Sequence, residues 1–153
     1  MDYKKIGDNF YIRLDKDDKV FQSLQNICEK EHIFSGHLQG IGACSNATVS
    51  FYQPKLKKFQ QHTVTGMLEI VSLLGNVVQN ADRKPQLHLH AIFSYLSDNS
   101  LPSVLAGHLV EATINYTGEI VLFPTQGTIT LAPDTKTEID IWHFNQGDNH
   151  EGT

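Results

Sequence analysis

Apolar and polar residues alternate in short runs along most of the chain, which is typical of β-strands with one buried face. The first such run, residues 7–14, places three apolar side chains on one side of an extended backbone: Phe10, Ile12 and Leu14. The spacing then changes. Over residues 18–32 apolar positions recur every three or four residues, which predicts an amphipathic helix with Asp17 or Asp18 as its N-cap.

Strand patterns return after the predicted helix and continue to the C-terminal region. The expected strands are residues 46–53, 59–64, 66–78, a hairpin over 86–111, 116–123, 128–131 and an edge strand within 139–144. Within the apolar run 66–78 we expect a bend at Gly75 and Asn76, because both residue types favour turns.

These elements predict an α+β fold in a single domain. About seven strands, one main helix and room for a second short helix, without a β-α-β rhythm, favour a largely antiparallel sheet. The 153 residues, or 17.2 kDa, fit one domain over 1–153 with its core within about 8–132. We expect the polar tail, residues 145–153, to be disordered.

The charge balance argues against a surface that grips nucleic acid by bulk electrostatics. The formal net charge is -5 and the pI is about 5.8. The best local basic patch is Lys55, Lys57 and Lys58, which we interpret mainly as a solvated turn.

The N-terminal segment and the apolar runs indicate where the protein is expected in the cell and whether its cysteines are reduced. No apolar run follows Met1–Lys5 as a signal peptide requires, and none approaches the roughly 18 residues of a membrane span. We therefore expect a cytoplasmic protein in which Cys28 and Cys44 stay reduced.

Two glycines, Gly40 and Gly42, invite comparison with nucleotide-binding loops. The full glycine-rich spacing is missing and no helical pattern follows. A bulge or tight bend in a strand-rich region is the favoured interpretation, with phosphate binding as the minor alternative.

The strongest chemical signal is a group of three histidines. His88 and His90 are two residues apart, so on a strand both rings project from one face about 7 Å apart. A hairpin turn at Asp98–Ser100 would place His108 opposite His90 on the next strand, where Cβ atoms lie about 5 Å apart. Three converging imidazoles are the ligand set that a divalent metal, zinc first, uses when a fourth position stays open.

Two carboxylates and four other histidines complete the list of candidates. Glu69 and Glu111 are candidates for the catalytic base or for orienting a ligand. His37 and His62 are candidates for additional metal ligands, although their positions in the sequence do not indicate that they lie near the other three. His143 and His150 are expected at the surface or in the tail. In the competing interpretation, sheet carbonyls and other polar contacts satisfy these histidines without any metal.

Four motifs in order resemble the PPC (plants and prokaryotes conserved) domain family, of the stand-alone prokaryotic type. They are Gly40-Ile41-Gly42-Ala43, Gly66-Met67-Leu68-Glu69-Ile70-Val71-Ser72-Leu73-Leu74-Gly75-Asn76, Leu87-His88-Leu89-His90-Ala91 and Gly107-His108-Leu109-Val110-Glu111. Together they cover roughly residues 8–132.

The resemblance implies an antiparallel α+β fold, a homotrimer, and association with DNA or with a DNA-binding protein partner. This chain departs from the plant members because it has no Arg-Gly-Arg-Pro element, and its only arginines are Arg13 and Arg83. The trimer-forming module therefore carries over, while direct DNA binding does not follow from the motifs.

Two functions remain open from the sequence. The first is a trimeric regulatory or DNA-associated module whose three-histidine metal site is structural or sensory. The second is a metal-dependent, zinc-type enzyme acting on a small molecule, with no membrane partner in either case.

Overall fold

The computed structural model of the protein describes residues 1–144. This part of the chain contains one helix and eight strands: β1 (Asp2–Ile6), β2 (Asn9–Leu14), α1 (Val20–Lys30), β3 (Gly36–Gln53), β4 (Lys58–Gln79), β5 (Pro85–Leu96), β6 (Pro102–Pro124), β7 (Thr130–Pro133) and β8 (Asp140–His143). The predicted tail, residues 145–153, lies outside the described residues.

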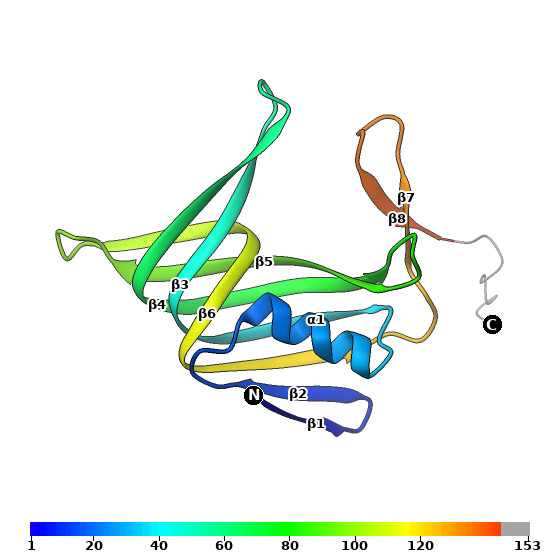
Figure 1. Cartoon of the computed structure of the whole chain (residues 1–153), viewed down its shortest axis with the longest axis horizontal. Helices are drawn as coiled ribbons and strands as arrows, with labels where there is room; N and C mark the ends of the chain where they lie inside the picture. The colour runs from blue at the N-terminus through cyan, green and yellow to red at the C-terminus, as the bar shows by residue number, and fades with distance from the viewer. Residues whose placement is uncertain (145–153) are drawn as a thin grey trace, which may run out of the picture.

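Four long strands form a closed circuit of antiparallel pairs. β3 pairs with β4, β4 with β5, β5 with β6, and β6 returns to pair with β3. The β1–β2 hairpin extends this sheet beyond β6, while β7 meets β4 through one parallel bridge and carries β8 (Figure 1). Three of the four strands have 18 to 23 residues and accumulate enough twist for the sheet to curl in this way.

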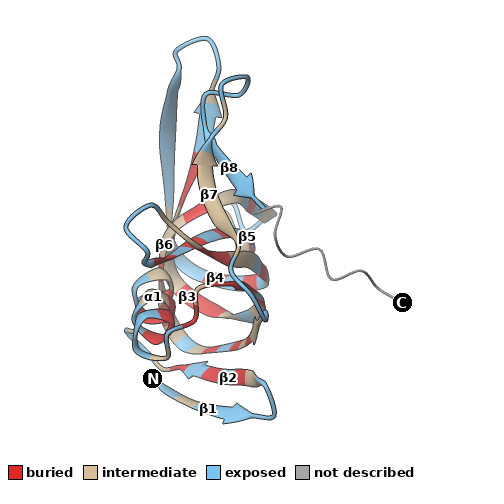
Figure 2. Ribbon diagram, turned by 90° about the vertical axis from the view of Figure 1, so that its right-hand side faces the viewer, coloured by how far each residue is buried: buried red, intermediate tan, exposed pale blue. Residues whose placement is uncertain are grey.

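The core fills the inside of the curled sheet, and α1 covers it. Four residues of α1 are buried hydrophobics: Val20, Leu24, Ile27 and Cys28. They face buried side chains of the four long strands in one hydrophobic cluster. Along those strands buried and exposed residues alternate (Figure 2), so each strand also presents a second set of side chains on what we call the outer face, away from the core.

The paired glycines lie within a strand and not in a phosphate-binding loop. The pairing register between β3 and β4 shifts between Gly40 and Gly42, as the interpretation of a bulge requires. A Cβ atom at Gly42 would lie 2.5 Å from the carbonyl oxygen of Thr117 in β6. Glycine is therefore needed here because two backbones approach each other closely.

Several predicted details need correction. The fold is mainly β with eight strands, not a balanced α+β fold with seven, and the described residues contain no second helix. β4 continues through Gly75 and Asn76 without the expected bend, since pairing on both sides holds it extended. The predicted strands 106–111 and 116–123 are parts of the single strand β6. β1 was missed because its side chains are almost all polar and exposed.

Candidate metal centre

The β5–β6 hairpin brings the three predicted histidines together. His88 and His90 alternate along β5 with buried Leu89, so both rings lie on the outer face. His90 is the register partner of His108 in β6, as a turn at Asp98–Ser100 predicts. The turn is closed by hydrogen bonds between residues 97 and 101, and Ser100 has a positive φ of 58°.

The side chains of these three residues, the histidine cluster, converge on one point. Ring centroids are 5.0 to 5.4 Å apart for the three pairs. One potential ligand atom from each ring lies within 4.8 Å of the other two. The Nε2 atoms of His88 and His90 are 3.2 Å apart. Two nitrogens each about 2.0–2.1 Å from a tetrahedral zinc ion are separated by about 3.3 Å, so the spacing of the His88–His90 pair fits two zinc ligands.

Crowding lowers the affinity of the cluster for protons. Burial lowers the pKa of His88, and the nearby His90 lowers it further. Burial is also the main cause of the lowered pKa of His108, followed by charge repulsion from His88 and His90. Neutral imidazoles, the form that binds metal, are therefore favoured.

The cluster faces solvent on one side. His88 and His90 are exposed, and His108 is half-buried. If these three side chains held a metal ion, their exposed side would leave room for water or a small ligand in a fourth position. This open arrangement differs from a closed four-ligand structural zinc site.

Glu111 lies at the start of α1 and not with the histidines. Its carboxylate accepts hydrogen bonds from the backbone N–H groups of Phe21 and Gln22, at 2.7 and 3.3 Å. Lys19 occupies the N-cap position without a side-chain hydrogen bond, so Asp17 and Asp18 do not cap the helix as predicted. Glu111, 90 residues away in the sequence, takes over that function.

Glu69 lies on the outer face of β4 but belongs to a different region. It pairs with Ala43 of β3 and Ser94 of β5. It lines a shallow hollow together with Tyr116 and Glu119. The structure therefore brings neither predicted carboxylate into the histidine cluster.

Four other histidines among the described residues are also separate from the cluster, including His32, which lies beside Phe34. His37 stacks on Phe123 with ring centroids 4.6 Å apart. His62 lies in β4 opposite Val49, and His143 ends β8. His150 lies outside the described residues.

Two residues beside the cluster were not predicted. Asn76 is the register partner of His88, and its Oδ1 atom is buried without a hydrogen-bond partner. The turn at residues 80–84 could have indicated this pairing, because it joins β4 to β5 and lies midway between Asn76 and His88 in the sequence. Ser50 is buried and lies opposite His108 in the β3–β6 pair. No local signal predicts that contact, because the two residues are far apart in the sequence.

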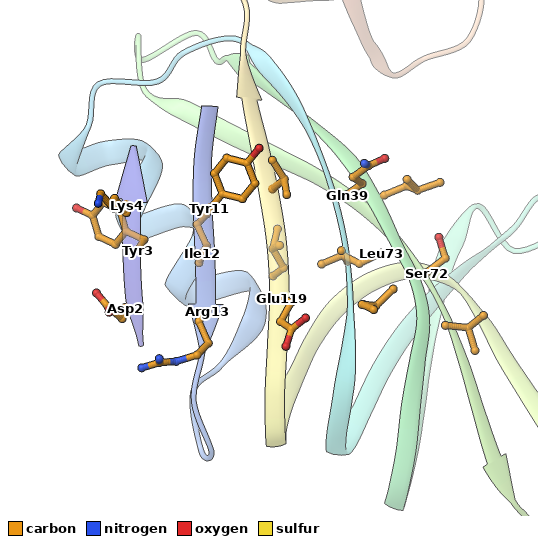
Figure 3. A pocket seen from close by; sticks show the side chains of 16 residues that line it. Asp2, Tyr3, Lys4, Tyr11, Ile12, Arg13, Gln39, Ser72, Leu73 and Glu119 are labelled. Carbon is orange, nitrogen blue, oxygen red and sulfur yellow. The ribbon is translucent and has the colours of Figure 1, made fainter. Parts of the chain in front are cut away.

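A groove of about 760 Å³ runs across the outer face next to the cluster (Figure 3). Its apolar lining includes Ile41, Val71 and Leu74, each more than half exposed. Leu74 is the register partner of His90, so the groove borders the histidine cluster. At the opposite side Tyr11 points over the groove from β2 (Figure 3).

The two cysteines do not add a reactive site. Both are free and buried. Burial raises the pKa of Cys28 to about 12, and burial followed by the nearby Glu69 raises the pKa of Cys44 to about 12. The reactive thiolate is therefore strongly disfavoured. The described residues include no helix long and apolar enough to cross a membrane.

Three solved structures resemble the chain over almost its whole length. A candidate DNA-binding protein from Bacteroides thetaiotaomicron is 30% identical, with a TM-score of 0.84 over 94% of this chain and 96% of that one. A metal-containing protein from Archaeoglobus fulgidus is 26% identical, with a TM-score of 0.78 over 94% and 99%. A plant- and prokaryote-conserved (PPC) protein from Pyrococcus horikoshii is 25% identical, with a TM-score of 0.74 over 95% of each chain.

A search of the curated protein sequences finds no match. The model of the Plants and Prokaryotes Conserved (PCC) domain matches residues 1–139. PCC and PPC are two abbreviations for the same family, so this match confirms the resemblance seen in the glycine and histidine motifs. The chain belongs to the PCC domain family.

Proposed function

We propose that this protein is a homotrimeric, DNA-associated regulatory module that holds a divalent metal ion, zinc, on His88, His90 and His108. The convergence of three imidazoles carries the proposal, because one potential ligand atom from each lies within 4.8 Å of the other two. The metal-containing protein from Archaeoglobus fulgidus, which has the same fold, supports it.

The donor set fits a borderline metal. Neutral imidazoles suit zinc, copper, iron and nickel, whereas magnesium and calcium prefer oxygen ligands. A bound ion of this kind supplies Lewis acidity at the exposed side of the cluster. The protein itself orients the three rings through β5 and β6, whose register places His90 opposite His108.

The outer face supports the proposed trimer. Ile41, Val71 and Leu74 form an exposed apolar surface along the groove. Contiguous apolar patches of this kind mark interaction sites on soluble domains. Burying the groove between copies would place the histidine cluster at the edge of a subunit interface.

A structural neighbour supports the proposed DNA association. The similar protein from Bacteroides thetaiotaomicron is a candidate DNA-binding protein. The net charge of -5 means that any contact with phosphates must be local.

The metal is tested by elemental analysis of untagged protein, because a histidine tag would bind metal itself. We expect about one metal ion per chain. The His88→Ala/His90→Ala variant should lose the ion and keep its oligomeric mass. The matched His37→Ala/His62→Ala variant should keep the ion, since neither residue belongs to the cluster. Wild-type protein that stays metal-free after dialysis against zinc would refute the site.

A second function, a zinc-type enzyme acting on a small molecule, is favoured by the solvent-exposed side of the cluster. p-Nitrophenyl acetate is a suitable reporter, because a Lewis acid at an open site promotes ester hydrolysis. Metal-dependent hydrolysis that disappears in His88→Ala/His90→Ala would support the enzyme. Equal rates in the two proteins would count against it.

A further inference from the structure

A two-stranded arm rises from the sheet where β3 and β4 extend past their other neighbours (Figure 1). β6 pairs with β3 only as far as Ser50, and β5 pairs with β4 only from Leu68. Beyond these points β3 and β4 pair with each other alone, ending with Gln53 opposite Lys58. We call residues 51–60 the arm; its residues are almost all exposed (Figure 2).

The arm is positively charged in an acidic protein. No Asp or Glu occurs between Glu31 and Glu69, and the only lysines in that segment are Lys55, Lys57 and Lys58. All three lie at or next to the turn that ends the arm. The segment therefore carries a formal charge of +3, while the whole chain carries -5. This concentration of charge is a local attraction for phosphate.

Apolar side chains accompany the lysines without contributing to the core. Leu56 lies between Lys55 and Lys57 in the turn and is 59% exposed. Tyr52 and Phe59 pair across the arm with ring centroids 5.2 Å apart, and each is more than half exposed. Leu56, Tyr52 and Phe59 therefore leave three large apolar side chains on the arm available for contact with another molecule.

We infer that the arm contacts duplex DNA through the minor groove, with its lysines on phosphates and Leu56 against the base steps. The inference rests on the DNA association proposed above and names the element responsible. Proteins that bind this groove combine cationic side chains with an inserted apolar residue that kinks the duplex. The arm has both, arranged within four consecutive residues from Lys55 to Lys58.

One carboxylate competes with the phosphates. Glu138, in the turn between β7 and β8, lies 3.6 Å from the Nζ atom of Lys57, and both side chains are 76% exposed. An exposed ion pair of this kind is weak, so a phosphate can replace the carboxylate. Glu138→Gln should therefore strengthen DNA binding.

The test measures binding of the full-length protein to a fluorescent A/T-rich duplex by anisotropy at several salt concentrations. Lys55→Gln/Lys57→Gln/Lys58→Gln should weaken binding by about tenfold or more. It should also reduce the slope of log affinity against log salt by about 0.9 for each lost phosphate contact. The variant Lys5→Gln/Lys16→Gln/Lys84→Gln changes the net charge equally and should bind like the wild type.

A second measurement addresses Leu56. Energy transfer between dyes at the two duplex ends reports bending, and Leu56→Ser should reduce the bend more than the affinity. Melting curves and metal content show that each variant is folded.

The outcomes separate this inference from the proposed function. A wild-type protein that does not bind the duplex refutes the DNA association and the inference together. Binding that the triple arm variant retains refutes the inference alone. A changed oligomeric mass in that variant, with DNA affinity intact, would assign the arm to a second copy of the chain.

Discussion

Repulsion and burial within the histidine cluster determine how the metal-free protein responds to acid. The pKa values of His88 and His108 are lowered in the fold, mainly by burial. In the unfolded chain the same imidazoles take up protons near pH 6.5. Below that pH the unfolded state therefore binds more protons than the folded state, and protonation favours unfolding.

We predict that stability of the metal-free protein is greatest above about pH 6.5 and falls as the pH drops toward the lowered pKa values. Urea unfolding at pH 7.5, 6.5 and 5.5 measures this loss. The loss should be smaller in His88→Gln/His108→Gln, because glutamine does not titrate. An equal loss in both proteins would show that other groups dominate.

Glu111 illustrates how a single residue can serve the fold where the sequence indicates chemistry. Its carboxylate, on β6, caps the N-terminus of α1. We predict that Glu111→Ala lowers the free energy of unfolding by about 0.5–2 kcal/mol, and Glu111→Gln by less, since an amide oxygen still accepts a hydrogen bond. Denaturant unfolding measures both. Metal content should not change in either variant. If Glu111→Gln lost metal without losing stability, Glu111 would instead belong to the metal site.

At the scale of elements, the β4–β5 pair sets the position of the cluster. Gly75 lies so close to β5 that a Cβ atom there would be 2.3 Å from the carbonyl oxygen of His88. The two strands can approach each other only because residue 75 has no side chain. The backbone that carries two of the three histidines is therefore held by a glycine on its neighbour.

We predict that Gly75→Ala destabilises the protein by about 1–3 kcal/mol through overpacking and weakens metal binding by displacing β5. Gly107→Ala is the matched control, because its nearest neighbour is the ring edge of Phe51 at 3.2 Å, which can move. Thermal unfolding and zinc titration measure the two effects. Equal zinc affinity in Gly75→Ala and the wild type would show that β5 is held by other contacts.

At the scale of the whole molecule, the outer face carries large apolar side chains that remain in contact with water when the subunit is alone. Ile41 is 57% exposed and Val71 is 53% exposed, on adjacent strands beside the groove. We predict that light scattering on the wild type gives three times the 17.2 kDa chain mass. Ile41→Lys/Val71→Lys should give single chains, because burying unpaired charges at an interface is costly.

The control for the trimer places the same charges elsewhere. Ile6 and Ile139 are also more than half exposed but do not line the groove. Ile6→Lys/Ile139→Lys should therefore remain trimeric. A wild type with the mass of one chain would contradict the proposed assembly.

Local patterns in the sequence determined the parts of the molecule that depend on near neighbours. The helical spacing of Val20, Leu24 and Ile27 predicted α1 to within two residues at each end. The turn residues Asp98–Ser100 predicted that His90 pairs with His108. Both predictions are correct because the contacts that form a helix or this hairpin join residues that are separated by only a few to about twenty positions in the sequence.

Only the tertiary structure decided what depends on distant partners. The capping of α1 by Glu111, the position of Ser50 opposite His108 and the closed circuit of β3, β4, β5 and β6 all join segments far apart in the chain. Burial and backbone pairing, and not residue type, select among the many pairings that such strands allow. The sequence alone thus determined that three histidines could meet, and the curled sheet decided which face they share and which carboxylates stay away from them.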